Sequence, residues 1–184
     1  MRRLCCVYSK IIYASECDVV NVDEETSISF INNNHLYGYL KTPISIGLLY
    51  RGELVGMLSI DIIDSDFFEI KRYCIKEDYC IYNALDKMLM YFNDNYHNVE
   101  VYIQCNCDMY SINNNLFKSV GFVEVCLVEP ECKWLKNNKI ALQSEIDNII
   151  SNYSGEEDIV EYLHEQRYFR LYNSGYIILR KEFN

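Results

Sequence analysis

Apolar residues along this chain of 184 residues recur at spacings that separate predicted strands from predicted helices. Two apolar runs, Ser45–Tyr50 and Glu53–Ile62, flank Arg51-Gly52, which is typical of a tight turn between antiparallel strands. A third strand is predicted over Phe67–Ile75. A helix is then predicted over Tyr82–Asn93, because apolar residues recur there at spacings of three and four: Leu85, Met88, Leu89 and Phe92.

Shorter elements are predicted on either side of this central part. A short helix is expected over Thr26–Asn33, with Asp23 as its N-cap. Beyond the central helix, the pattern predicts a strand, a short helix that ends at Gly121, and another strand: Val99–Cys105, Asn113–Val120 and Phe122–Val128.

After Trp134 the pattern becomes helical again. One apolar stripe at helical spacing predicts a helix: Leu142, Ile146, Ile149, Ile150 and Tyr153. A second helix is predicted over Glu156–Glu165. Asn173-Ser-Gly175 is typical of a turn, so Tyr168–Tyr172 and Tyr176–Arg180 are predicted to form a terminal hairpin.

The order of these elements predicts the fold class. Helix, hairpin, strand, helix, strand, helix, strand is typical of an α/β (α+β) domain with a mixed central sheet flanked by helices, here followed by C-terminal helices and a hairpin. Half of the residues are apolar, which is enough for one core. The two prolines, Pro43 and Pro130, mark no linker, and no Gly/Ser-rich stretch does so, so residues 1–184 are predicted to form a single domain.

The formal net charge of −10 argues against direct binding to nucleic acid, because a polyanion is bound by clustered Lys and Arg. Two acidic stretches would instead attract a basic partner protein. The first contains Asp61, Asp64, Asp66 and Glu69, and the second contains Glu156, Glu157, Asp158, Glu161 and Glu165. A solubilising surface is the alternative interpretation of each stretch.

The nine cysteines are expected to be reduced and mostly buried, because their number is odd and the core is ample. Cys105 and Cys107 form a pair, but no second pair follows at zinc-ribbon spacing and the histidines are scattered, so no metal is expected. Alternate positions on a strand explain this pair equally well. No apolar run approaches the length of a membrane span or of a signal-peptide core, so a soluble, cytoplasmic protein is expected.

Five local motifs, in a fixed order over residues 18–180, carry a resemblance to a known family. They are Phe30–Gly38 with its His-x-x-Gly turn, the hairpin Ile46–Ser59, the strand Phe68–Cys74, the Gly-Phe motif at the end of Asn115–Phe122, and Tyr168–Gly175. The chain resembles the GNAT-type, acetyltransferase-like domain of phage-encoded proteins, of the kind appended to homing-endonuclease modules. The resemblance implies a GNAT-like sheet with the helix of Tyr82–Asn93 crossing it.

The resemblance also implies where a cofactor would bind. Acetyltransferases of this type hold the pyrophosphate of acetyl-CoA on a glycine-rich loop at the start of the central helix, where backbone N–H groups and the helix dipole favour phosphate. The corresponding stretch, Glu77–Leu85, contains no glycine, and none occurs between Gly56 and Gly121. Glu77 and Asp78 would repel phosphate. We therefore expect no cofactor and a catalytically degenerate protein.

If acetyl-CoA did bind, the same correspondence implies contacts from the start of the central helix: Asn83, Ala84 and Leu85. Asn83 tolerates the left-handed conformation that the missing glycine would adopt. Phe117 stands where related enzymes often have a tyrosine that protonates the leaving thiolate, and a phenyl ring has no proton to give. Tyr110 would substitute only if its loop brought it within hydrogen-bonding reach.

Two residues are candidates for a general base. Glu69 lies on a strand where the resemblance implies a carboxylate that activates the acceptor amine. The competing interpretation is an ion pair with Lys71 or Arg72. His35 is the second candidate, and a turn histidine that is hydrogen-bonded to the backbone is its alternative.

Two hypotheses follow from the residues and the resemblance. The first is a non-catalytic GNAT-like binding protein of phage or mobile-element origin that contacts a basic, nucleic-acid-handling protein, in its most specific version an anti-CRISPR-like inhibitor of a host defence nuclease. Its partner-binding residues would be Asp61, Asp64, Asp66, Glu156, Glu157 and Asp158. The alternative is an acyl-CoA-dependent N-acetyltransferase with an atypical cofactor loop. Neither direct nucleic-acid binding nor membrane binding is expected.

Overall fold

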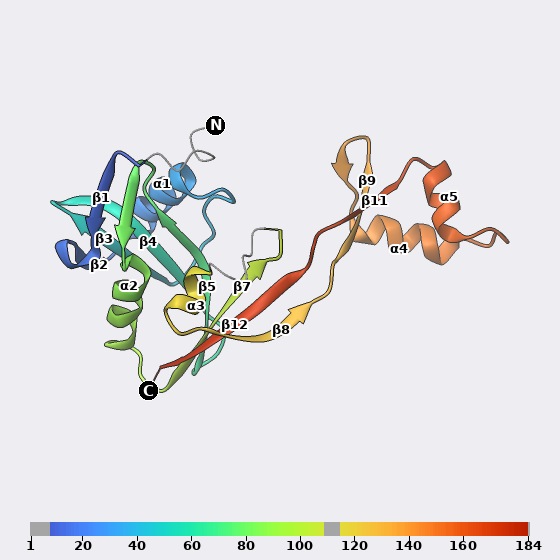
Figure 1. Ribbon diagram of the computed structural model, residues 1–184. Coiled ribbons are helices and arrows are strands. Elements are labelled where there is room, and N and C mark those ends of the chain that lie inside the picture. Colours follow the sequence, from blue (N-terminus) through green and yellow to red (C-terminus); the bar gives the residue numbers. More distant parts are fainter. Residues whose placement is uncertain (1–7, 109–114, 184) are drawn as a thin grey trace. The chain divides into compact units, whose positions relative to one another are not determined.

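The computed structural model describes residues 8–108 and 115–183, and the chain forms two compact units (Figure 1). Unit 1 comprises Met1–Gln104, Ile112–Val125 and Ile178–Asn184. Unit 2 comprises Cys105–Ser111 and Cys126–Ile177. The chain therefore leaves unit 1, builds most of unit 2, and returns to unit 1 with its last residues.

A seven-stranded mixed sheet is the centre of unit 1. Its strands lie in the order β2-β3-β4-β5-β7-β12-β8. Their bounds are β2 (Asp18–Asn21), β3 (Ile44–Tyr50), β4 (Glu53–Ile62), β5 (Phe67–Ile75), β7 (Val99–Asn106), β12 (Tyr176–Phe183) and β8 (Val123–Val128). The strands from β2 to β5 pair antiparallel in sequence order, whereas β5 and β7 pair in parallel. The mixed central sheet predicted from the sequence is confirmed.

Two helices, α1 (Glu24–Asn34) and α2 (Ala84–Asn93), cover opposite faces of this sheet. Met57 of β4 packs in one buried cluster with Phe30 of α1. Phe68 of β5 is the partner of Ile62 on β4 and lies edge-on to Phe92 of α2, with 5.3 Å between ring centroids. Because odd and even positions of a strand point to opposite faces, the two contacts lie on opposite sides of β4.

The start of α2 differs from the sequence prediction. Tyr82 was expected in this helix, but it ends the short strand β6 (Tyr79–Tyr82), which pairs in parallel with β1 (Lys10–Tyr13) as a separate two-stranded sheet. A left-handed residue, Asn83 with φ of 60°, separates β6 from α2. A short 3-10 helix, η2 (Ala14–Glu16), follows β1.

The caps of the other unit 1 helices follow the sequence closely. The side chain of Asp23 accepts a hydrogen bond from the Thr26 N–H at 2.9 Å, as expected for the N-cap of α1. The short helix α3 (Leu116–Ser119) begins after Asn115, whose side chain accepts from two backbone N–H groups. Gly121 follows with φ of 94°, a conformation that favours glycine, so the short helix ends there as predicted.

Unit 2 contains a three-stranded antiparallel sheet and two helices. The strand order is β10-β9-β11. Their bounds are β9 (Cys132–Lys136), β10 (Lys139–Ile140), α4 (Gln143–Asn152), α5 (Ile159–Glu165) and β11 (Phe169–Tyr172). The buried residues Ile146, Leu163 and Tyr168 form the unit 2 core, and Trp134 packs against them.

The terminal hairpin predicted from Asn173-Ser-Gly175 is wrong. β11 pairs with β9 in unit 2, whereas β12 joins the seven-stranded sheet. The turn residues explain the difference, because the Asn173 side chain accepts from the Glu131 N–H at 2.9 Å and its own N–H donates to the Glu131 carbonyl at 3.3 Å. Asn173 is thereby tied to the segment before β9 and does not close a hairpin with β12.

The described cysteines are less buried than the sequence suggested. Cys17 and Cys74 are buried, whereas Cys126 on the edge strand β8 is exposed and the remaining described thiols are half-buried. None of the seven described cysteines forms a disulfide, and the described part of the chain holds no cluster of three or more His, Cys, Asp or Glu suited to a metal. Cys105 lies on β7, and Cys107 follows the end of that strand. No helix among the described residues is long and apolar enough to span a membrane.

Candidate functional site

The segment Lys76–Asn83, between β5 and α2, is the candidate site. It contains two residues in the left-handed region, Asp78 with φ of 73° and Asn83 with φ of 60°. Asp and Asn tolerate this conformation better than most residues, because their short polar side chains bond locally. The chain therefore makes both turns into α2 without a glycine.

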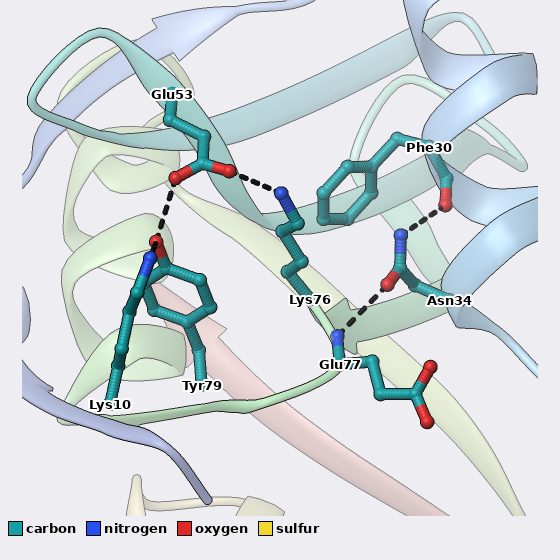
Figure 2. A network of polar contacts seen from close by, with 7 residues as sticks. All are labelled: Lys10, Phe30, Asn34, Glu53, Lys76, Glu77 and Tyr79. Carbon is teal, nitrogen blue, oxygen red and sulfur yellow. Dashed lines mark hydrogen bonds and ion pairs between the residues drawn. The ribbon is translucent and has the colours of Figure 1, made fainter.

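A polar network fixes the first half of this segment (Figure 2). Glu53 at the start of β4 forms an ion pair with Lys76 through one carboxylate oxygen. The Tyr79 hydroxyl donates to the other oxygen at 2.7 Å and accepts from the Lys10 ammonium at 2.7 Å. Hydrogen bonds from Lys76, and then from Tyr79, lower the pKa of Glu53, so this carboxyl is ionised near neutral pH.

Backbone bonds fix the segment from two further sides. The Glu77 N–H donates to the Asn34 side-chain oxygen at 3.0 Å, which joins the segment to the end of α1 (Figure 2). The Asp78 carbonyl accepts from the Ser9 and Lys10 N–H groups, each at 3.0 Å. From Lys10↔Tyr79 to Tyr13↔Tyr82, β1 then pairs with β6 residue by residue. Alternate peptide groups of β6 are therefore already bonded to β1.

The start of α2 is the part of the site that remains suited to an anion. Asn83 makes no side-chain capping bond to the first turn. The side chains of Ala84 and Leu85 are buried, so these two residues can meet a ligand only through their backbone N–H groups. Glu77 and Asp78 are exposed immediately upstream and oppose a negative ligand.

β5, which leads into this segment, separates from its neighbour β7 partway along. β5 and β7 pair from Phe67↔Glu100 to Ile70↔Ile103, although both strands continue beyond these residues. On its other edge, β5 skips one residue relative to β4, because Ser59 faces Arg72 and Ile60 faces Ile70. Lys71 is therefore the extra residue of a β-bulge, a feature that bends a strand and ends regular pairing.

The chain resembles known proteins in its fold. No family model matches the chain, and no curated protein matches it. Among solved structures, the ribosomal-protein-S18-alanine N-acetyltransferase from Escherichia coli superimposes with a TM-score of 0.56 at 9% identity, over 91% of this chain and 94% of that one. The fold is that of the GNAT acetyltransferases.

Two other GNAT-fold structures agree. An acetyltransferase from Bacillus subtilis in complex with CoA gives a TM-score of 0.50 at 12% identity, over 91% of this chain and 99% of that one. Ard1 from Thermoplasma volcanium gives a TM-score of 0.50 at 12% identity, over 92% of this chain and 99% of that one. The GNAT-like fold expected from the five motifs is confirmed. Identities this low show the fold and nothing finer.

Glu69, the predicted base, lies in the central sheet, but its carboxylate is engaged in an ion pair. Glu69 of β5 forms an ion pair with Lys71, 2.5 Å apart, and both side chains are largely shielded from solvent. This is the alternative interpretation that the sequence left open. Arg72 instead donates through Nε to the Gly38 carbonyl at 2.8 Å. Tyr110, the predicted acid, lies outside the described residues.

Sequence reasoning missed a tyrosine of β5 that lies beside Phe117. The Tyr73 ring stands edge-on to the Phe117 ring, with 6.3 Å between centroids. Burial raises the pKa of Tyr73, so its phenol keeps its proton at neutral pH. Tyr73 is distant in sequence from the Gly-Phe motif, and no local pattern links the two. His35 accepts from the Tyr37 N–H at 3.2 Å, so it is a turn histidine bonded to backbone.

The predicted acidic residues form two separate groups. In unit 1, Asp61 lies opposite Glu69 in the β4–β5 register, and Asp64 and Asp66 occupy the exposed turn between these strands. Among the ion pairs of the described residues, none involves these three aspartates. In unit 2, the exposed residues Glu156 and Glu157 precede α5, and Asp158 caps that helix by accepting from Val160 N–H at 2.6 Å.

Proposed function

We propose that this chain is a GNAT-fold binding protein that does not turn over acetyl-CoA. The observation that carries the proposal is the pairing of β1 with β6 along Tyr79–Tyr82. In the resemblance this segment corresponds to the glycine-rich loop that receives the pyrophosphate. Here alternate peptide groups of its backbone are bonded to the chain's own strand, so these groups could receive a pyrophosphate only if that strand moved away.

The charges of the segment support the same conclusion. Lys76 is the one cation within residues 76–83, and Glu53 already neutralises it. Glu77 and Asp78 remain exposed and add two carboxylates to the segment. A phosphate group approaching α2 would therefore meet two carboxylates and no free cation of this segment, which is repulsive.

The partner that we propose is a basic, nucleic-acid-handling protein. The exposed turn with Asp64 and Asp66, together with Asp61, supplies carboxylates at one end of the sheet that form no ion pair among the described residues. Such a group steers a cationic partner and speeds its association at low salt. The most specific version, an anti-CRISPR-like inhibitor of phage origin that acts on a host defence nuclease, rests on this charge together with the resemblance.

Calorimetric titration with acetyl-CoA at near-physiological salt tests the proposal. We expect no saturable binding in the micromolar range of working enzymes. The double variant Glu77→Gln, Asp78→Asn keeps the shapes of both side chains and removes their charge. Weak binding gained by that variant would assign the exclusion to electrostatics. A micromolar dissociation constant for the unmodified chain would refute the proposal.

An acyl-CoA-dependent N-acetyltransferase is the second candidate, and specific observations favour it. β5 and β7 part after Ile70 and Ile103, and the first turn of α2 lacks a side-chain cap. Tyr73 offers a protonated phenol beside Phe117. If this candidate is correct, the chain should transfer acetyl groups to an amine acceptor, and Tyr73→Phe should lower the rate of transfer without weakening acetyl-CoA binding.

A further inference from the structure

A pocket of about 450 Å³ lies at the start of β6, at the opposite end of that strand from α2. Its walls come from three parts of unit 1: residues 9–12 around the start of β1, the turn between β3 and β4, and Tyr79 of β6. Tyr79 and Tyr82, the two ends of β6, are about 10 Å apart along an extended strand. This pocket, which we call the hairpin pocket, is therefore distinct from the start of α2.

Two cations of the hairpin pocket, Lys10 and Arg51, have donors to spare. The Lys10 ammonium donates to the Tyr79 hydroxyl at 2.7 Å (Figure 2), and an ammonium carries three donors. The Arg51 guanidinium lies over the Tyr50 ring, 5.1 Å from its centroid, and stacking of this kind leaves the N–H groups at its edge open. Among the ion pairs of residues 8–108 and 115–183, none involves either cation.

The carboxylate that lines the hairpin pocket, Glu53, is already neutralised. One of its oxygens pairs with Lys76 and the other accepts from Tyr79 (Figure 2). With Lys76 counted as the partner of Glu53, three cations and one carboxylate give a local net charge of +2. The exposed residues Glu77 and Asp78 line a different pocket, beside α1. In a chain with a net charge of −10, the hairpin pocket is therefore locally suited to an anion.

The backbone at Arg51 is an independent sign that a cation is needed there. Arg51 and Gly52 have φ of 51° and 79°, and two-residue turns with both values positive favour Asn-Gly. Of the seven non-glycine residues with positive φ in the described part of the chain, five are Asn or Asp, and the exceptions are Arg51 and Arg167. A residue kept in a conformation that its type disfavours is a reason to look for a function.

We propose that the hairpin pocket binds a small molecule through a phosphate monoester group. The planar fork of Arg51 takes two phosphate oxygens, and the Lys10 ammonium takes a third. Two available cations match a group that is doubly charged above about pH 6, whereas a carboxylate or a phosphodiester carries one charge. Ile11 and Ile12 line the pocket as well and offer an apolar wall to the rest of the ligand. This inference goes beyond the proposed function, which concerns acetyl-CoA at α2 and the aspartates of unit 1.

Titration of the full-length chain with phenyl phosphate at pH 7.5 tests the proposal, followed by NMR through the backbone amides of Ser9 and Tyr79. We expect saturable shifts at both amides and weaker binding of benzoate, which has one charge. Lys10→Gln should weaken phenyl phosphate binding by about tenfold, because it removes a charge-assisted hydrogen bond. Lys41→Gln is the matched control, since it removes the same charge from an exposed residue of unit 1 outside the pocket and should leave affinity unchanged.

Arg51→Asn separates binding from folding. Asparagine suits the turn better than arginine does, so the urea midpoint should stay the same or rise while phenyl phosphate binding falls by about tenfold or more. The proposal is overturned if neither amide shows a saturable shift, if benzoate binds as tightly as phenyl phosphate, or if Arg51→Asn and Lys10→Gln both behave like Lys41→Gln. Acetyl-CoA that displaces phenyl phosphate would assign the pocket to the cofactor and overturn this proposal and the proposed function together. Absence of phenyl phosphate binding alone would leave the proposed function standing.

Discussion

The hydrogen bond between the end of α1 and the segment before α2 can be measured with two neighbouring asparagines. Asn33 and Asn34 each donate through the side-chain amide to the carbonyl four residues earlier, at 2.9 and 2.8 Å. Asn34 alone of the two accepts from the Glu77 N–H. The variants Asn33→Ala and Asn34→Ala therefore differ in the bond to the Glu77 N–H, which only Asn34→Ala removes.

The expected difference follows from that bond. Both variants lose one local amide bond and gain similar helix propensity, so these effects cancel between them. Asn34→Ala also leaves the Glu77 N–H without its acceptor, which costs roughly 1 kcal/mol of unfolding free energy. For a chain of this size, that corresponds to a melting temperature lower by about 2–4 °C relative to Asn33→Ala.

Urea denaturation of both variants measures the difference, and hydrogen exchange of the Glu77 amide locates it. Exchange at Glu77 should be faster in Asn34→Ala and unchanged in Asn33→Ala. Equal unfolding free energies within about 0.3 kcal/mol, together with unchanged exchange at Glu77, would show that α1 does not hold the segment in place.

Three further results are expected. Gly47→Ala should lower the unfolding free energy by about 1–3 kcal/mol in urea melts, because the added Cβ would come within 2.6 Å of two side-chain methyl groups. Burial raises the pKa of Tyr73, so above about pH 10 the phenol ionises first in the unfolded chain and the protein loses stability as the pH rises. In urea melts at several alkaline pH values, Tyr73→Phe should show a smaller loss. A thiol reagent should label Cys126 rapidly in the folded chain and label Cys17 and Cys74 only after denaturation. Equal labelling rates for all three cysteines would contradict this expectation.

The sequence was sufficient where structure is determined by local periodicity. β5 has the bounds predicted, and the β3–β4 hairpin turns at Arg51-Gly52, because alternating apolar residues and a tight turn specify such a unit locally. The ion pair of Glu69 was also within reach, since Lys71 and Arg72 are the nearest cations in the sequence and Lys71 is the one that pairs.

The features that the sequence did not predict depend on contacts between residues that are distant in the chain. β6 is four residues long and pairs with β1, where the Lys10 and Tyr79 side chains that bond lie 69 residues apart. No local pattern indicates such a pairing. The same limit applies to β11 and β12. Asn173 and Gly175 specify a turn between them, but not the sheet that each strand joins. Tyr73 beside Phe117 is a third case, since β5 and α3 meet only in the folded chain.

The position of β12 in the sheet has a consequence for how the protein folds during synthesis. β12 lies between β7 and β8, so these two strands are joined to each other only through residues 176–183. β8 leaves the ribosome many residues earlier, and it stays without its neighbour while the chain of unit 2 is made. Closure of the sheet therefore waits for a contact of high sequence separation, which is the slow kind of folding step. Leu179 and Phe183 are buried when it forms, so β12 also completes the core.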